Sequence, residues 1–174
     1  MTIDQLNRLS EDDALTAFEQ CCGAYQWMER MVYSRPFEDL AEVLETSDNV
    51  WDECDVNDYE EAFSFFPRIG HPEDLQPFKH PQEGLDGLGA KWAGHELKGF
   101  ELATAEEMDK LKDLGTAYEK KFGYLFVINA PGKSVAEVLE AMATRLGNDP
   151  KQEIEIAAAE QHKITQLRLK KLLA

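Results

Sequence analysis

The stretch Phe63-Ser64-Phe65-Phe66-Pro67-Arg68-Ile69-Gly70 organises the rest of the chain. It is a short aromatic run that ends at a proline and a glycine, and apolar residues lead into it at helical spacing from Tyr59. Because proline disfavours the helical conformation of the residue before it, we predict a helix that ends before Pro67 and passes into a long irregular connection. A rigid corner of this kind is a suitable place for a functional site.

Towards the N-terminus, two regions have helical spacing and recognisable ends. Ser10, followed by three acidic residues, is a typical N-cap, and apolar residues then recur up to Gly23. A second region covers residues 27–32, after which Pro36 either breaks the chain or opens the next helix. We therefore predict one helix in each region.

The third region before the corner contains a polar interruption. An apolar stripe over residues 37–44 is followed by Thr-Ser-Asp-Asn at 46–49 and by a second stripe over 50–54. Because serine, aspartate and asparagine favour caps and turns over helix interiors, we predict two helices here.

Beyond the corner, the composition changes before it becomes helical again. Residues 67–99 are rich in glycine, proline and histidine, and a connection of this length is usually functional. Thr104 and Ser134 each precede a glutamate by three residues, which is the capping-box pattern, and they open helices that end at Gly123 and at 147–148. A last helix runs from about residue 151 to the end.

The segment Tyr124-Leu125-Phe126-Val127-Ile128-Asn129-Ala130 has the composition of a buried strand. The chain offers no second strand to pair with it, so we expect an irregular buried segment whose main-chain groups could bind a polar ligand. The predicted fold is all-α, a single-domain bundle of roughly eight helices over residues 1–174 with a long functional loop.

Composition limits the classes of partner and the compartment. The formal charge of −16 over 174 residues argues against binding to nucleic acid or to an anionic membrane surface, although small anionic substrates remain possible. The three cysteines form no CxxC pair, and the acidic N-terminus has no signal sequence. We therefore expect a cytoplasmic protein with reduced, buried thiols.

Two charged residues stand out as candidates for a site. Arg168 shares a helix face with Ala157, Gln161 and Ile164, which should point inward. Its guanidinium would either pair with one of the many carboxylates, or reach the surface, or bind the carboxylate of a ligand. Glu96 follows Trp92 in the long loop, and a carboxyl group beside an aromatic ring is suited to acid–base work.

Other polar groups do not form recognisable sites. The four histidines lack the spacings of zinc ligands, so we expect no metal site. Gly132-Lys133-Ser134 resembles the end of a phosphate-binding loop, but the leading glycine is absent and a helix N-cap explains it better.

Five blocks together resemble the 2-oxo-4-hydroxy-4-carboxy-5-ureidoimidazoline (OHCU) decarboxylase family. They span nearly the whole chain in the family's order, and the combination of FGYLFVI, GKS and the terminal arginine-leucine pair is the specific part. The blocks are FEQCCGAYQWMERMVYSRPF, AFSFFPRIG, KWAGHELKG, AYEKKFGYLFVINAPGKSVAEVLEAMATRLGND and EIEIAAAEQHKITQLRLKKLL.

The resemblance implies an all-helical homodimer that decarboxylates OHCU to (S)-allantoin in urate degradation, without a cofactor. It also implies roles for residues of this chain. Glu96 matches the catalytic glutamate, Arg168 matches the substrate-binding arginine, and Pro67 matches the proline of the family's His-Pro corner. The main chain from Leu125 through Phe126 and Val127 to Ile128 matches the segment that holds the substrate ring.

Three positions depart from the family pattern. Phe66 stands where the family has its catalytic histidine, Leu97 where it has a glutamine, and Ala93 where it usually has a serine. Phenylalanine cannot exchange a proton, so the role is vacant unless a histidine of the loop at 71, 80 or 95 replaces it. Two hypotheses follow: an OHCU decarboxylase, or a divergent relative with weak or no activity that binds a small cyclic ligand or a partner protein.

Overall fold

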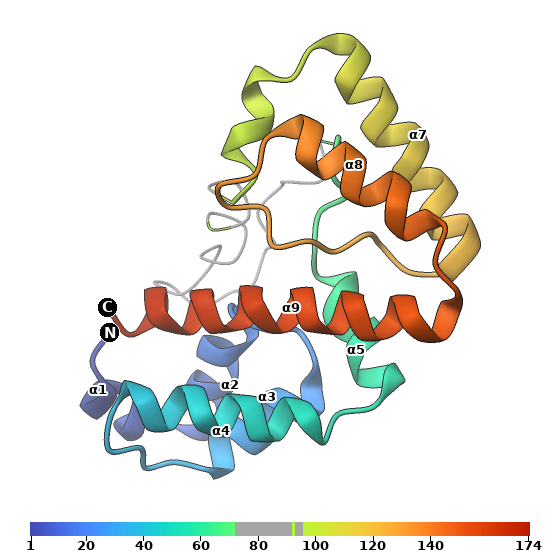
Figure 1. Ribbon diagram of the computed structural model, residues 1–174. Coiled ribbons are helices and arrows are strands. Elements are labelled where there is room, and N and C mark those ends of the chain that lie inside the picture. The colour runs from blue at the N-terminus through green and yellow to red at the C-terminus, as the bar shows by residue number, and fades with distance from the viewer. Residues whose placement is uncertain (72–91, 93–95) are drawn as a thin grey trace.

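The computed structural model describes residues 1–71, 92 and 96–174, and every regular element in that part of the chain is a helix. Helix α9 crosses the molecule, with α1–α4 on one side of it and α7 and α8 on the other (Figure 1). This confirms the predicted all-α class. The elements are α1 (Ile3–Arg8), α2 (Glu11–Glu19), α3 (Tyr25–Tyr33), α4 (Leu40–Asp52), α5 (Val56–Ser64), the 3₁₀ helix η2 (Lys98–Leu102), α7 (Ala105–Phe122), α8 (Val135–Leu146) and α9 (Pro150–Leu172).

The helix starts that the sequence predicts at Ser10, Thr104 and Ser134 are confirmed, whereas α2 ends at Glu19, before the predicted Gly23. Ser10 accepts a hydrogen bond from the main chain of α2, and Thr104 and Ser134 form complete capping boxes at the starts of α7 and α8. Gly123 ends α7 in the left-handed conformation, with φ of 86°. Each cap satisfies main-chain groups that a helix end leaves unpaired.

The prediction of two helices over 37–54 is wrong, because α4 continues unbroken from Leu40 to Asp52. Ser47 is fully buried, and the side chain of Asp48 accepts a hydrogen bond of 2.6 Å from Gln166 of α9. The same carboxylate lies 2.5 Å from Nε2 of His162. Tertiary contacts with α9 therefore outweigh the low helix propensity of the polar run.

Two hydrophobic clusters form the core, and the segment 124–130 passes between them without forming a strand. The first cluster comes from α1–α5 and α9, and the second mainly from α7 and α8. Val127 belongs to the first cluster, whereas Phe126 and Ile128 belong to the second. Successive side chains thus point to opposite sides, as they do in an extended chain.

Helix α9 joins the elements on both of its sides. Trp51 of α4 donates a hydrogen bond of 3.2 Å from Nε1 to the carbonyl oxygen of Ala158. The two chain ends meet where the amino group of Met1 donates to the carbonyl oxygen of Leu172 at 2.6 Å, and Figure 1 shows them side by side.

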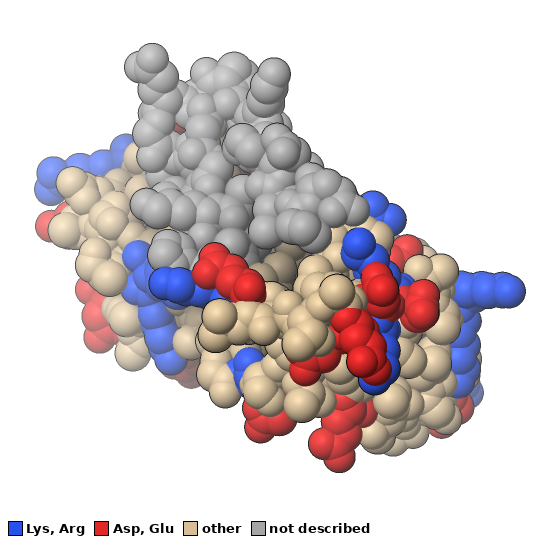
Figure 2. All heavy atoms as spheres, turned by 90° about the horizontal axis from the view of Figure 1, so that it is seen from above, with Lys and Arg blue, Asp and Glu red and all other residues tan. Residues whose placement is uncertain are grey.

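None of the described helices has the length and apolar composition needed to span a bilayer. Acidic and basic side chains are interspersed on the face seen in Figure 2.

Candidate active site

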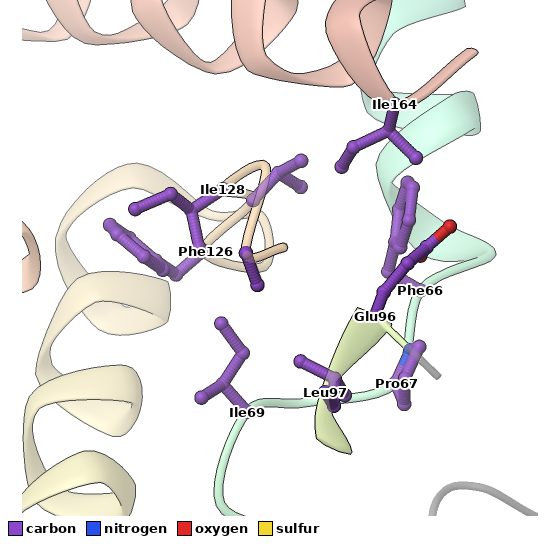
Figure 3. Close-up of a pocket in the computed structure, with 10 residues that line it drawn as sticks. Phe66, Pro67, Ile69, Glu96, Leu97, Phe126, Ile128 and Ile164 are labelled. Carbon is purple, nitrogen blue, oxygen red and sulfur yellow. The ribbon is translucent and has the colours of Figure 1, made fainter. Parts of the chain in front are cut away.

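The aromatic corner forms where the sequence predicts it. Helix α5 ends at Ser64, with Phe65 as its C-cap, and the N–H of Phe66 donates to the carbonyl oxygen of Phe63 at 3.1 Å. Proline at 67 then stops the helical pattern, so that the chain turns away from α5. This turn places Phe66 and Pro67 on the wall of a cavity (Figure 3).

The cavity lies between the corner, the segment 124–130 and α9. Its volume is about 20 Å³, which is space for a single water molecule rather than for a ring. Among the described side chains that line it, Glu96 is the polar one and the others are apolar. The lining residues are Phe66, Pro67, Ile69, Glu96, Leu97, Phe126, Val127, Ile128, Ala130 and Ile164.

Glu96 and Arg168 form a buried ion pair at this cavity. Nε of Arg168 donates to Oε1 of Glu96 at 3.1 Å, and Nη2 donates to Oε2 at 2.9 Å. Only 7% of the Arg168 side chain and 8% of the Glu96 side chain are exposed. Of the alternatives for Arg168, the structure therefore shows pairing with a carboxylate of the chain, and that carboxylate belongs to the other candidate residue.

Phe66 covers the same guanidinium from another side. Its ring centroid lies 4.9 Å from the Cζ atom of Arg168, which is a cation–π contact. Lys171, one turn along α9, places its Nζ atom 3.7 Å from Oε1 of Glu96. The charged pair is thus contacted by the Phe66 ring and by the Lys171 ammonium group.

The segment 124–130 lines the cavity through residues 126–128 and Ala130, and two charged side chains bind its main chain. Nη1 of Arg145 donates to the carbonyl oxygen of Val127 at 2.8 Å. Oε2 of Glu160 accepts from the N–H of Asn129 at 2.7 Å. Neither the N–H nor the C=O of Ile128 makes a hydrogen bond with another described residue. A residue that lines the cavity thus has two main-chain groups without a partner among the described residues.

Sequence reasoning missed a second buried ion pair, between Arg145 of α8 and Glu153 of α9. Nε of Arg145 donates to Oε1 of Glu153 at 2.7 Å, and the hydroxyl of Tyr118 donates to the same oxygen at 2.6 Å. Asn148 donates to the other oxygen, Oε2, at 2.9 Å. Helical spacing could have predicted this pair. Arg145 lies on the same inward face of α8 as Val138 and Met142, just as Arg168 lies on the inward face of α9.

Not every predicted residue reaches the cavity. Leu125 and His71 instead line a separate small cavity next to α7 and α8. Ala93, His80 and His95 lie outside the described residues, as does most of the predicted functional loop. Among the described residues, no histidine lines the cavity beside Glu96.

The three cysteines are free, as the sequence predicts. Cys21 and Cys22 are fully buried at the end of α2, and burial raises the pKa of the Cys22 thiol to about 12. Burial likewise raises the pKa of the Cys54 thiol to about 12. Thiols that stay protonated at neutral pH are poor nucleophiles.

Comparison with known proteins gives a consistent result. The sequence model of the family described as OHCU decarboxylase matches residues 7–170. A "Uric acid degradation bifunctional protein TTL" of Arabidopsis thaliana is 34% identical over 155 residues, which is 88% of this chain and 45% of that protein. The chain thus spans less than half the length of this plant relative. A 2-oxo-4-hydroxy-4-carboxy-5-ureidoimidazoline decarboxylase of Amia calva is 30% identical over 167 residues, covering 83% of this chain and 93% of that protein.

Solved structures extend the similarity to the fold. An OHCU decarboxylase crystallised in the presence of (S)-allantoin is 33% identical with a TM-score of 0.73, covering 91% of this chain and 97% of that one. An (S)-allantoin synthase shares the fold at 16% identity and a TM-score of 0.68, over 99% of this chain and 54% of that one. The match along nearly the whole length, together with the helical fold, shows that the chain belongs to the OHCU decarboxylase family of lyases.

Proposed function

We propose that this chain decarboxylates OHCU to (S)-allantoin in urate degradation, without a cofactor, and that it does so slowly. The supporting observation is the Glu96 carboxylate, which lines the cavity while it is bonded through both oxygens to Arg168. The reaction needs a group that can carry a proton and a group that can hold an anion. The Glu96 carboxyl group and the Arg168 guanidinium, buried side by side, can provide them.

Arg168 is the proposed holder of the substrate's carboxylate. A planar guanidinium binds carboxylates through two parallel hydrogen bonds, and it already does so with Glu96. The entering substrate carboxylate would share or replace this partner. Lys171, which is also near Glu96, would then keep the glutamate side chain in place.

Glu96 is the proposed proton donor. In the reaction, the bond between the ring carbon and the carboxylate breaks, carbon dioxide leaves, and the electron pair is taken up by the conjugated ring. A proton must then be added to one face of the ring to give a single enantiomer of allantoin. Glu96 is the acidic side chain that lines this cavity among the described residues. Once the substrate's carboxylate has replaced it on Arg168, the Glu96 carboxylate can take up the proton that the substrate's hydroxyl group releases as it becomes the ring carbonyl, and it is placed to deliver that proton to the ring.

The main chain of residues 125–128, of which 126–128 line the cavity, is the proposed holder of the ring, beside the side chains of Pro67 and Leu97. The ring and its ureido group carry amide donors and acceptors, and the unpaired main-chain groups at Ile128 complement them. The roles of Ala93 and of the loop around it lie outside the described residues. The cavity of about 20 Å³ must enlarge before a ring enters.

A second candidate function is binding without efficient turnover. The observation that favours it is the Phe66 ring, which lies on the Arg168 guanidinium at 4.9 Å and cannot relay a proton. With Leu97 in place of a glutamine, the walls are more apolar than the family pattern implies. Such a site would suit a small cyclic ligand, or a partner protein that inserts an apolar side chain.

The test is to follow OHCU consumption and (S)-allantoin formation by circular dichroism with the purified protein. We expect stereospecific product at a low rate that Glu96→Ala abolishes. Turnover that is unchanged in Glu96→Ala would refute the proposed role of the carboxylate. Absence of turnover, combined with saturable binding of (S)-allantoin, would favour the binding function.

Two properties of the whole protein belong to the same proposal. We expect a homodimer, because the family resemblance implies one, and sedimentation of the purified chain would measure it. We also expect cytoplasmic location, in keeping with its free cysteines and its strongly acidic composition.

A further inference from the structure

The two peptide groups on either side of Ile128 are each held by a charged side chain. Arg145 binds the carbonyl oxygen of Val127 at 2.8 Å, and Glu160 binds the N–H of Asn129 at 2.7 Å. The first contact fixes the peptide group between residues 127 and 128, and the second fixes the group between 128 and 129. Ile128, which lines the cavity, is thus anchored at both of its peptide bonds.

The planarity of the peptide bond determines what the anchors leave exposed. In a trans peptide, the C=O of one residue and the N–H of the next point in opposite directions. With the carbonyl of Val127 turned to Arg145, the N–H of Ile128 points away from it. With the N–H of Asn129 turned to Glu160, the C=O of Ile128 points away from that carboxylate.

The N–H and C=O of Ile128 point to the edge of the segment 124–130 that adjoins the cavity. The side chains of Phe126 and Ile128 pack on one side of the segment, and that of Val127 packs on the other. All three residues nevertheless line the cavity, so the cavity adjoins an edge of the segment rather than one of its faces. Arg145 and Glu160 occupy one edge. In Figure 3 Phe126 and Ile128 lie across the cavity from Phe66 and Glu96.

Arg145 is held firmly enough to orient a peptide. Besides its bond to Glu153, its guanidinium lies over the ring of Phe126, with Cζ 4.2 Å from the centroid. Glu153 is completely buried and receives a further bond from Tyr118. A buried pair with this many partners has little freedom, because any rotation would leave a charge unpaired in the interior.

We propose that Arg145, fixed by Glu153, is a positioning residue that presents the N–H and C=O of Ile128 to the ring amide of a cyclic ureide. A ring amide carries its own N–H and C=O side by side, so it can accept from and donate to the same residue. This inference rests on the proposed function in one respect only, that the ring of the ligand occupies the cavity beside Glu96.

The test uses hydantoin, a small cyclic ureide, as an uncharged probe. The ¹⁵N-labelled protein is titrated with hydantoin while the amide signals are observed by NMR. We expect the Ile128 amide proton to shift downfield and to saturate. The matched probe 1,3-dimethylhydantoin has no ring N–H, and we expect it to bind about tenfold more weakly.

Variants separate positioning from simple stability. Arg145→Lys keeps a positive charge beside Glu153 but loses the guanidinium nitrogen Nη1 that binds the carbonyl oxygen of Val127. We expect this variant to bind hydantoin about tenfold more weakly. Trp51→Phe removes a buried hydrogen bond to the carbonyl oxygen of Ala158, outside the Arg145–Glu153 network, and we expect binding within about twofold of the parent. If Arg145→Lys does not fold, Glu160→Ala releases the neighbouring peptide and should weaken binding in the same direction.

The outcomes keep this inference distinct from the proposed function. An Ile128 signal that does not move with hydantoin, or equal losses in Arg145→Lys and Trp51→Phe, would overturn the positioning role even if the protein forms (S)-allantoin. A specific shift at Ile128 that needs Arg145 would support it even if the protein shows no decarboxylation.

Discussion

Arg168 and Glu96 face each other with two hydrogen bonds, of 3.1 Å between Nε and Oε1 and 2.9 Å between Nη2 and Oε2. The pair joins α9 to the chain just before η2, across 72 residues of sequence. Because both charges are buried, each depends on the other for its solvation. The proposed reaction therefore begins from a state in which the anion-binding group already holds an anion.

The stability of this pair can be measured directly. Arg168→Met leaves the Glu96 carboxylate buried without its main partner, and we expect the free energy of unfolding to fall by about 3–5 kcal/mol. The double variant Arg168→Met with Glu96→Met removes both charges and should recover most of that loss. Urea denaturation followed by circular dichroism measures both, and a double variant no more stable than the single one would contradict this account.

Phe66 is expected to limit the reaction rate. Replacing it with histidine, together with Leu97→Gln, restores a proton-carrying side chain and an amide at the cavity wall. General acid–base groups contribute factors of about 10²–10⁴, so we expect the rate of (S)-allantoin formation to rise at least about tenfold. Phe65→His, at the neighbouring half-exposed position, is the control and should leave the rate unchanged. A rate that does not respond to the double change would favour the binding function.

The carboxyl group of Glu160 should make the free energy of unfolding depend on pH. Burial alone would raise the pKa of its carboxyl group, but the bonds from Lys163 and from the N–H of Asn129 lower the pKa below its ordinary value. A carboxyl with a lowered folded-state pKa stabilises the protein above its unfolded pKa of about 4.3, and that contribution disappears as the pH falls through the folded value.

The variant Glu160→Gln is therefore expected to be less stable than the parent at pH 7, with a difference that shrinks on acidification below about pH 4. Glu155→Gln removes an exposed carboxylate from the same helix and serves as the control. Urea midpoints measured between pH 3 and pH 7 give the comparison. A difference that is constant over this range would show that the carboxyl charge is not responsible.

Two glycines of α7 should respond in opposite directions to alanine. Gly123 ends the helix at φ of 86°, where a side chain is strained, so Gly123→Ala should cost about 1 kcal/mol. Gly115 is helical, and an added Cβ would meet the Cε atom of Met142 at an ordinary 3.6 Å. Gly115→Ala should therefore stabilise by about 0.5–1 kcal/mol, and thermal denaturation of the two variants tests both signs.

The sequence predicts what depends on short-range pattern. Ser10, Thr104 and Ser134 cap helices because the donors they satisfy lie within three residues of them. The inward position of Arg168 follows from helical spacing and is confirmed by its burial. The irregular path of 124–130 also follows, since an unpaired strand has no partner for its ladder.

Long-range contacts explain what the sequence does not predict. The partner of Arg168 could have been any of 34 acidic residues, and only the folded chain selects Glu96. The continuity of α4 depends on contacts of Asp48 with a helix more than a hundred residues away. The role of Arg145 depends on Val127 and Glu153, neither of which is within one turn of it.

Helix α9 sets the spacing between the parts of the candidate site. Glu160, Ile164 and Arg168 follow one another at intervals of four residues, and they contact the ring-holding segment, the cavity and Glu96 in turn. The distance between the ring-holding and anion-holding groups is thus set by a rigid rise of about 1.5 Å per residue. Inserting one residue between Glu160 and Ile164 would rotate everything beyond it by about 100° and separate the two functions. Side chains that contact α9 at this spacing, of which Phe66 is one, are therefore positions where a substitution would alter the site without altering the distance between the two functions.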